Sequence, residues 1–135
     1  MTAGKRTFTF SPVNGVPPKV GPFAHATQWE DLLFITGQMP TDPATGNVVG
    51  DNVVAQAAQV RRNLEAVLGQ FGLTLDDALM VRVYLTCFDD YAEFNENYSG
   101  WFSGPLPSRT CVGVNGLAVG ALVEIDLIAG ISRKD

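Results

Sequence analysis

The sequence predicts an α+β fold in which two helices cover one face of a β-sheet. Two segments carry apolar residues at three- and four-residue steps, which is the period of an amphipathic helix, and several others alternate apolar and polar residues, as half-buried strands do. Their order along the chain is strands, helix, strand, helix, strands. Each helix has one apolar face, and the alternating strands give the sheet an apolar face as well. We therefore expect the helices to pack on the sheet with these apolar faces buried between them.

The first third of the chain predicts a loop followed by two strands. Residues 11–22, SPVNGVPPKVGP, are rich in proline and glycine and indicate an extended or looped lead-in. Residues 26–40 predict two short strands about a polar turn at Glu30–Asp31. Residues 41–51 then predict a second loop, with turn-forming residues at Asp42–Pro43 and Gly46.

The clearest helical pattern covers residues 53–71. Asp51 is expected to cap its N-terminus and Gly72 to end it. Its apolar face consists of Val53, Ala57, Val60, Leu64, Val67, Leu68 and Phe71.

A strand and a second helix are expected next. In the strand, residues 79–86, one face is predicted to hold Leu79, Val81, Val83 and Leu85. In the helix, residues 89–102, Asp90 and Glu93 resemble a capping box. The apolar stripe of this helix is Tyr91, Phe94, Tyr98 and Trp101.

The last two predicted strands place charged residues in a very apolar part of the chain. We expect them to pair about a turn at Leu117–Ala118, with Cys111 opposite Glu124 and Arg109 near Asp126. Arg109, Cys111 and Glu124 would then lie on the sheet face away from the helices. Since much of that face is apolar, it predicts a covering partner subunit.

Two interpretations of these charges stay open. One is a structural pair between Arg109 and a carboxylate at an interface. The other is an anion site, in which Arg109 offers a planar fork to a carboxylate and Glu124 acts on water or a proton beside it.

We expect residues 1–135 to form one domain, and its composition excludes several classes of function. The net charge of −5 and the scattered basic residues argue against a nucleic-acid binder or an anionic-membrane binder. Two cysteines and one histidine do not suggest a disulfide framework or a metal site. Without a secretory signal or an apolar run of about 20 residues, the sequence predicts a cytoplasmic protein.

Several motifs together resemble the RidA/YjgF family of reactive-intermediate (enamine/imine) deaminases. They are GPFAHA, LLFITGQMPTDPATGNVVGD, QAAQVRRNLEAVL, VRVYLTCFDDYAEFNENY, PSRTCV and ALVEIDLIA, which span about Gly21 to Ala129. The resemblance implies a chorismate-mutase-like fold with a mixed sheet. It also implies a homotrimer with the sheets inside, the helices outside and ligand clefts between subunits.

The resemblance also implies a reaction and its residues. The reaction is cofactor-free and metal-free hydrolysis of short-lived 2-enamine or 2-imine acids, such as 2-aminoacrylate, to a 2-oxo acid and ammonia. Arg109 matches the arginine that holds the substrate carboxylate, and Glu124 matches the acid that positions or activates water. The remaining matches are Cys111 as a pocket wall, Asn95 as the polar residue of the second helix that faces the pocket, and Thr36 and Gly37 as the Ser-Gly of the family's usual Ser-Gly-Gln turn.

The sequence departs from the family pattern around this predicted pocket. Phe23 stands where a tyrosine is usual, His25 stands where many members have glutamine, and the segment before Arg109 looks short. We therefore hypothesise a divergent member with a different or larger substrate. The alternatives are a non-catalytic regulatory module that binds a small carboxylate, a ribonuclease, and a chorismate mutase, since fold does not fix function.

Overall fold

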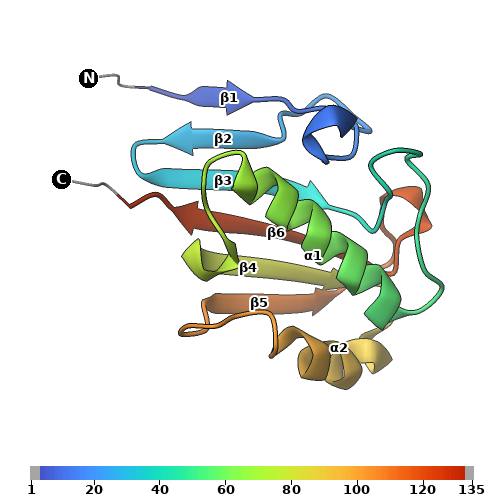
Figure 1. The fold of residues 1–135 in the computed structure, drawn as a ribbon. Helices are drawn as coiled ribbons and strands as arrows, with labels where there is room; N and C mark the ends of the chain where they lie inside the picture. Colours follow the sequence, from blue (N-terminus) through green and yellow to red (C-terminus); the bar gives the residue numbers. More distant parts are fainter. Residues whose placement is uncertain (1–3, 133–135) are drawn as a thin grey trace.

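A computed structural model describes residues 4–132 as a mixed six-stranded sheet with two α-helices on one face, as predicted (Figure 1). The strands are β1 (Arg6–Phe8), β2 (Ala26–Trp29), β3 (Leu32–Gln38), β4 (Ala78–Leu85), β5 (Ser108–Gly113) and β6 (Val123–Gly130). Their order in the sheet is β1-β2-β3-β6-β4-β5. The helices are α1 (Val53–Gly69) and α2 (Tyr91–Tyr98).

The core lies between the sheet and the helices, where the alternation patterns placed it. Every second residue of β6 is buried against the helices, from Val123 to Ala129. The predicted face of α1 is buried except for Phe71, which lies past its end and is partly buried. Leu79 was assigned wrongly to the buried face: an irregularity between Ala78 and Met80 shifts the register of β4, and Leu79 is 50% exposed.

A polar stripe on α1, which the sequence analysis did not single out, fixes the loops beside it. Asn63 donates from Nδ2 to the carbonyls of Met39 and Thr41, both at 2.9 Å. Gln56 accepts a hydrogen bond from the backbone N–H of Leu122 at 2.8 Å. The N-cap is Asn52 and not Asp51, because the Asn52 side chain accepts from the Ala55 N–H at 2.9 Å. The helix therefore anchors the chain just after β3 and just before β6.

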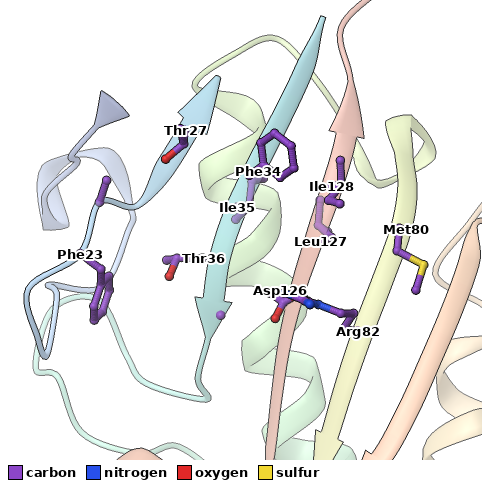
Figure 2. Close-up of a pocket in the computed structure, with 12 residues that line it drawn as sticks. Phe23, Thr27, Phe34, Ile35, Thr36, Met80, Arg82, Asp126, Leu127 and Ile128 are labelled. Atoms are coloured by element: carbon purple, nitrogen blue, oxygen red, sulfur yellow. Dashed lines mark hydrogen bonds and ion pairs between the residues drawn. The ribbon is translucent and has the colours of Figure 1, made fainter. Parts of the chain in front are cut away.

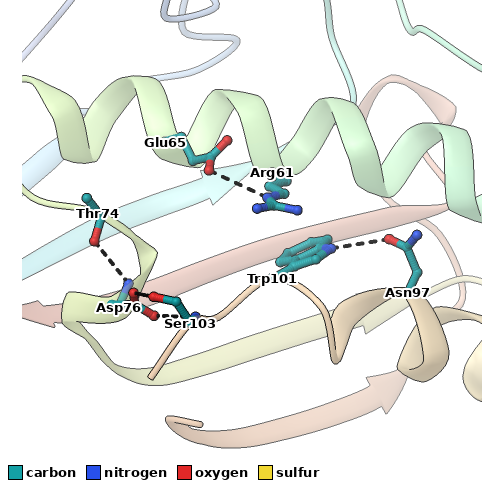
Figure 3. Close-up of polar contacts among 7 residues, drawn as sticks. All are labelled: Arg61, Glu65, Thr74, Asp76, Asn97, Trp101 and Ser103. Carbon is teal, nitrogen blue, oxygen red and sulfur yellow. Dashed lines mark hydrogen bonds and ion pairs between the residues drawn. The ribbon is translucent and has the colours of Figure 1, made fainter. Parts of the chain in front are cut away.

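The segment between α2 and β5 is held beneath α1 (Figure 3). Trp101 is buried, donates from Nε1 to Asn97 at 3.2 Å, and has the Arg61 guanidinium 5.7 Å from its ring centre. Asp76 accepts the backbone N–H of Ser103 at 3.0 Å.

The predicted capping box at Asp90 is wrong, because Asp90 has helical backbone angles and its side chain caps nothing.

The predicted pairing of the last two strands is also wrong. β5 pairs in parallel with β4 at the edge of the sheet, and β6 lies between β3 and β4. The connection over 114–122 passes around the end of β4, where Leu85 accepts from the Val114 N–H at 2.8 Å and Thr86 donates to the Leu122 carbonyl at 3.1 Å. β6 is regularly buried on one face whereas β5 has no buried residue, so β6 takes the interior position and β5 the edge.

His25 is a buried structural residue that ties the N-terminal lead-in to the sheet. Its ring is 2% exposed, and Nδ1 accepts from the Phe10 N–H while Nε2 donates to the Pro17 carbonyl, both at 2.9 Å. These two bonds require the neutral ring with its proton on Nε2. Burial lowers the pKa of His25, so the ring resists protonation in the folded protein.

We expect His25 to make stability fall in mild acid. The unfolded chain binds a proton on His25 near its ordinary pKa of 6.5, whereas the folded chain does so only at lower pH. Stability present above pH 6.5 is therefore lost as the pH falls, by at most about 1.4 kcal/mol per pH unit. Urea titrations between pH 7.5 and 5 should show a steeper fall for the wild type than for His25→Gln. Parallel curves for the two proteins would contradict this assignment.

Candidate functional site

An open cleft of about 640 Å³ lies on the sheet face away from the helices (Figure 2). Strands β2, β3, β4 and β6 and the loop before β2 supply its walls. The lining residues are Phe23, Ala24, Thr27, Phe34, Ile35, Thr36, Gly37, Met80, Arg82, Asp126, Leu127 and Ile128. Three of the predicted site residues, Phe23, Thr36 and Gly37, are among them. Thr36 and Gly37 lie within β3 and not in a turn, at a register irregularity between Ile35 and Gln38.

Glu124 lies against the backbone of Gly37 beside this cleft. A Cβ atom built on Gly37 would be 2.9 Å from the carboxyl carbon of Glu124 and nearer still to a carboxylate oxygen. Glu124 is half-buried, and its pKa is raised, first by burial and then by the charge of Asp126. The absence of a side chain at Gly37 thus lets the carboxylate lie next to the main chain of β3.

Replacing Gly37 with alanine is expected to displace the Glu124 carboxylate and to lower activity more than stability. The new methyl group would overlap the flexible side chain of Glu124 and no backbone atom. Glu124 can therefore rotate away at a modest cost in folding free energy. If the Glu124 carboxylate takes part in a reaction, kcat should fall by roughly tenfold or more, since catalysis depends on placing the acid. The matched control is Gly69→Ala on α1, where an added Cβ meets nothing within 4 Å. Equal kcat values for Gly37→Ala and the wild type would contradict the role of this contact.

The ion pair on this face is between Arg82 and Asp126, and Arg109 is not near Asp126 as the sequence analysis expected. Arg82 Nε lies 2.7 Å from Asp126 Oδ1, and the Tyr84 hydroxyl donates to Asp126 Oδ2 at 3.1 Å. The alternation of β4 already put Arg82 and Tyr84 on one face. Only the strand order, with β4 next to β6, brings them to Asp126.

Arg109 and Cys111 face the helices, which corrects the expectation that they share a face with Glu124. In the parallel ladder they lie beside Val81 and Val83, both of which point into the helix-side core. Arg109 packs against aromatic rings of α2. Burial raises the pKa of Cys111, which keeps the thiol protonated and suits a pocket wall better than a nucleophile.

Asn95 joins Arg109 and Cys111 on the helix side of the sheet. It lies on the same face of α2 as Tyr91 and Tyr98, the rings against which Arg109 packs. Its Oδ1 atom is buried without a hydrogen-bond partner in the described part of the chain. A buried acceptor that is left unpaired has a free-energy cost, which a ligand or a water molecule would offset.

The predicted site residues therefore form two groups on opposite faces of one sheet. Phe23, Thr36, Gly37 and Glu124 lie on or beside the cleft away from the helices. Asn95, Arg109 and Cys111 lie on the helix side, at the edge strand β5 and the helix α2. Because β4 lies between β5 and β6, and Arg109 and Glu124 are on opposite faces of the sheet, a single chain does not bring them to one small ligand.

Within residues 4–132, no three histidine, cysteine, aspartate or glutamate side chains are arranged to hold a metal ion. No helix within this range has the length and apolar character that crossing a bilayer requires.

Comparisons with known proteins agree with the sequence motifs. The model of the family described as Endoribonuclease L-PSP matches residues 15–131. RutC family protein y4sK of Sinorhizobium fredii is 41% identical over 88% of this chain and 94% of its own length. The mouse (Mus musculus) 2-iminobutanoate/2-iminopropanoate deaminase is 34% identical over 84% of each chain.

Solved structures show the same fold. The crystal structure of YyfA from Yersinia pestis, described as a protein of unknown function of the conserved Rid family, superposes with a TM-score of 0.87 at 33% identity. The match covers 95% of this chain and 100% of that one. The chain thus belongs to the Endoribonuclease L-PSP family, the RidA/YjgF family whose motifs its sequence carries.

Proposed function

We propose that this protein hydrolyses reactive 2-enamine and 2-imine acids to 2-oxo acids and ammonia, in clefts that two subunits share. The observation that carries the proposal is the split site: a guanidinium on one face of the sheet and a half-buried carboxylate on the other. Each half has part of the chemistry, and stacking two chains would unite them. The deaminase named among the relatives supports a small imino acid as substrate.

In the proposed reaction Arg109 of one subunit binds the substrate carboxylate with its planar fork. Glu124 of the next subunit holds a water molecule and accepts a proton from it as the oxygen attacks the imine carbon. The proton passes to nitrogen, the C–N bond of the carbinolamine breaks, and ammonia leaves as the C=O bond forms. The raised pKa of Glu124 suits this role, since the carboxyl must both accept and return a proton.

A homotrimer is proposed as the assembly that completes these sites. The sheet face away from the helices exposes large apolar side chains that a monomer rarely leaves open, at Trp29, Leu32, Phe34 and Leu79, which are 38–50% exposed. Closed cyclic assembly would cover this face and repeat the same cleft at each interface. Light scattering should give about three times the chain mass of 14.5 kDa.

We favour a small carboxylate over RNA as the ligand, despite the ribonuclease in the family's description. The cleft contains Arg82, but its guanidinium is paired with Asp126. The chain carries a net charge of −5, whereas nucleic-acid sites carry clustered positive charge. Any real phosphate contact would weaken steeply with salt, so a salt titration of RNA binding separates the two ligands.

The test is release of ammonia and 2-oxo acid from enzymatically generated 2-aminoacrylate and from longer 2-imino acids. Acceleration over the uncatalysed rate is expected for at least one chain length. A comparison of wild type with Phe23→Tyr will show what the missing hydroxyl does to chain-length preference. Binding of 2-oxobutanoate without turnover of any imine would replace this proposal with the regulatory module.

A further inference from the structure

We infer that Tyr91, Phe94 and Tyr98 are positioning residues, whose aromatic rings hold the Arg109 guanidinium ready for a carboxylate while leaving most of its hydrogen-bond donors free. The inference rests on the proposed function for the identity of the carboxylate, a 2-imino or 2-oxo acid. It concerns residues that would not touch the substrate themselves. These three rings are called the aromatic cage below.

The geometry of the cage is the first observation. The Cζ atom of Arg109 lies 4.9 Å from the ring centre of Tyr98, 5.7 Å from that of Tyr91 and 5.8 Å from that of Phe94. All three distances are within the range of a cation–π contact. Residues 91, 94 and 98 recur at three- and four-residue steps on α2, so one helix face presents all three rings to β5.

The absence of a carboxylate partner is the second observation. Within residues 4–132, the ion pairs are those of Arg61 with Glu65 and Arg82 with Asp126, and Arg109 is in neither. Among the residues that the structure describes, its one side-chain hydrogen bond is a long one of 3.4 Å from a terminal nitrogen to the Tyr91 hydroxyl. Arg82 shows the contrast, because its fork is already engaged by Asp126 at 2.7 Å.

These observations together explain how a half-buried cation stays available. A charge partly removed from water needs compensation. An acidic neighbour would supply it but would also occupy the N–H groups that recognise a substrate carboxylate. Ring faces attract the cation without accepting its N–H groups, so the planar fork stays open at one edge.

Tyr98 contributes through its ring and not through its hydroxyl. The side chain is 6% exposed, and its hydroxyl is buried with no partner among the described residues. Burial raises the pKa of Tyr98 to about 12, so the phenol stays neutral and gives Arg109 no counter-ion. Tyr98→Phe therefore keeps what the cage needs and removes an unpaired polar group.

The variants for the test are Tyr91→Leu and Tyr98→Leu, with Tyr98→Phe as the conservative control. Tyr91 is 36% exposed, so its truncation leaves the core intact even if Tyr98→Leu does not fold. From the strength of an exposed cation–π contact, we expect Tyr91→Leu to raise KM for the imine and Kd for 2-oxobutanoate by about 2- to 5-fold. Because chemistry at Glu124 is untouched, kcat should stay within about twofold.

A second readout follows Arg109 directly and needs no turnover. The Nε–Hε signal of Arg109 in NMR spectra should be shifted by the rings and should report restricted motion in the wild type and in Tyr98→Phe. In Tyr91→Leu the ring shift should shrink and the motion increase. A merely structural role for Tyr91 would lower the melting temperature and leave both this signal and Kd unchanged.

The outcomes separate this inference from the proposed function. If the wild type binds 2-oxobutanoate but hydrolyses no imine, the proposed reaction is wrong. The Kd values of the wild type, Tyr91→Leu and Tyr98→Phe for 2-oxobutanoate then still test whether the aromatic cage positions Arg109. If the wild type does not bind 2-oxobutanoate, the NMR signal alone decides. An Arg109 signal and a Kd that are the same in wild type and a folded Tyr91→Leu would overturn the inference.

Discussion

Replacing Arg109 with alanine is expected to lower kcat/KM for a 2-imino acid by roughly two to four orders of magnitude. The reason is the loss of a bidentate, charge-assisted pair with the substrate carboxylate, in which each hydrogen bond contributes about 1.5–3 kcal/mol. Arg109→Lys should recover only part of the loss, because an ammonium is a point charge and cannot form the planar fork. Initial rates of ammonia release over a range of imine concentrations provide the measurement.

The control for Arg109→Ala is Arg61→Ala. Arg61 lies on α1, with its guanidinium over Trp101 and its Nε atom 3.5 Å from Glu65 (Figure 3). Neither of these partners is a predicted site residue. Its removal takes away the same charge from the same chain and should leave kcat/KM within about twofold, as expected for a surface site outside the reaction. If both variants lose activity equally, a general loss of positive charge is responsible and the carboxylate-binding role of Arg109 is wrong.

Replacing Glu124 with glutamine is expected to lower kcat by about 10²–10⁴-fold while KM changes little. Glutamine keeps the size of the side chain beside Gly37 but cannot accept a proton from water. The same assay, with single-turnover rates where the signal allows, separates kcat from KM. An unchanged kcat in a folded Glu124→Gln protein would exclude Glu124 as the base.

The acid side of the pH–rate profile should follow the titration of Glu124. The base must be ionised, so kcat/KM should fall as the pH drops through a pKa that burial and Asp126 have raised above the ordinary glutamate value of 4.5. Asp126→Asn removes the neighbouring negative charge, and this acid limb should therefore move to lower pH. A limb that stays in place in Asp126→Asn would show that another group controls it.

The sequence predicted the local pattern of the fold well because burial imposes a period on each element. The alternation of residues 121–129 identified the buried face of β6, and the heptad-like spacing of residues 53–68 identified that of α1. The motifs also gave the family. Local sequence does not predict the buried polar stripe of α1, with Gln56 and Asn63, because the partners of these side chains are main-chain groups of distant loops.

The sequence could not predict which face of the sheet receives Arg109. β5 is an edge strand without a buried residue, so its alternation is weak and fits either orientation. Val112 points away from the helices and is 40% exposed, whereas Arg109 packs against the rings of α2. The choice depends on parallel pairing with β4, which is a non-local contact that periodicity does not encode.

The most direct test of a shared site is to mix two inactive chains. Arg109→Ala and Glu124→Gln should each be inactive alone. When the two variants are co-refolded in equal amounts, the mixture should regain about one quarter of wild-type activity. The reason is that in a closed ring of randomly mixed chains about one interface in four joins an intact Arg109 to an intact Glu124. Each chain refolded alone serves as the control. Recovery near this fraction is the result the split geometry predicts. Active single variants, or a mixture no more active than its separate chains, would contradict a site built from two subunits.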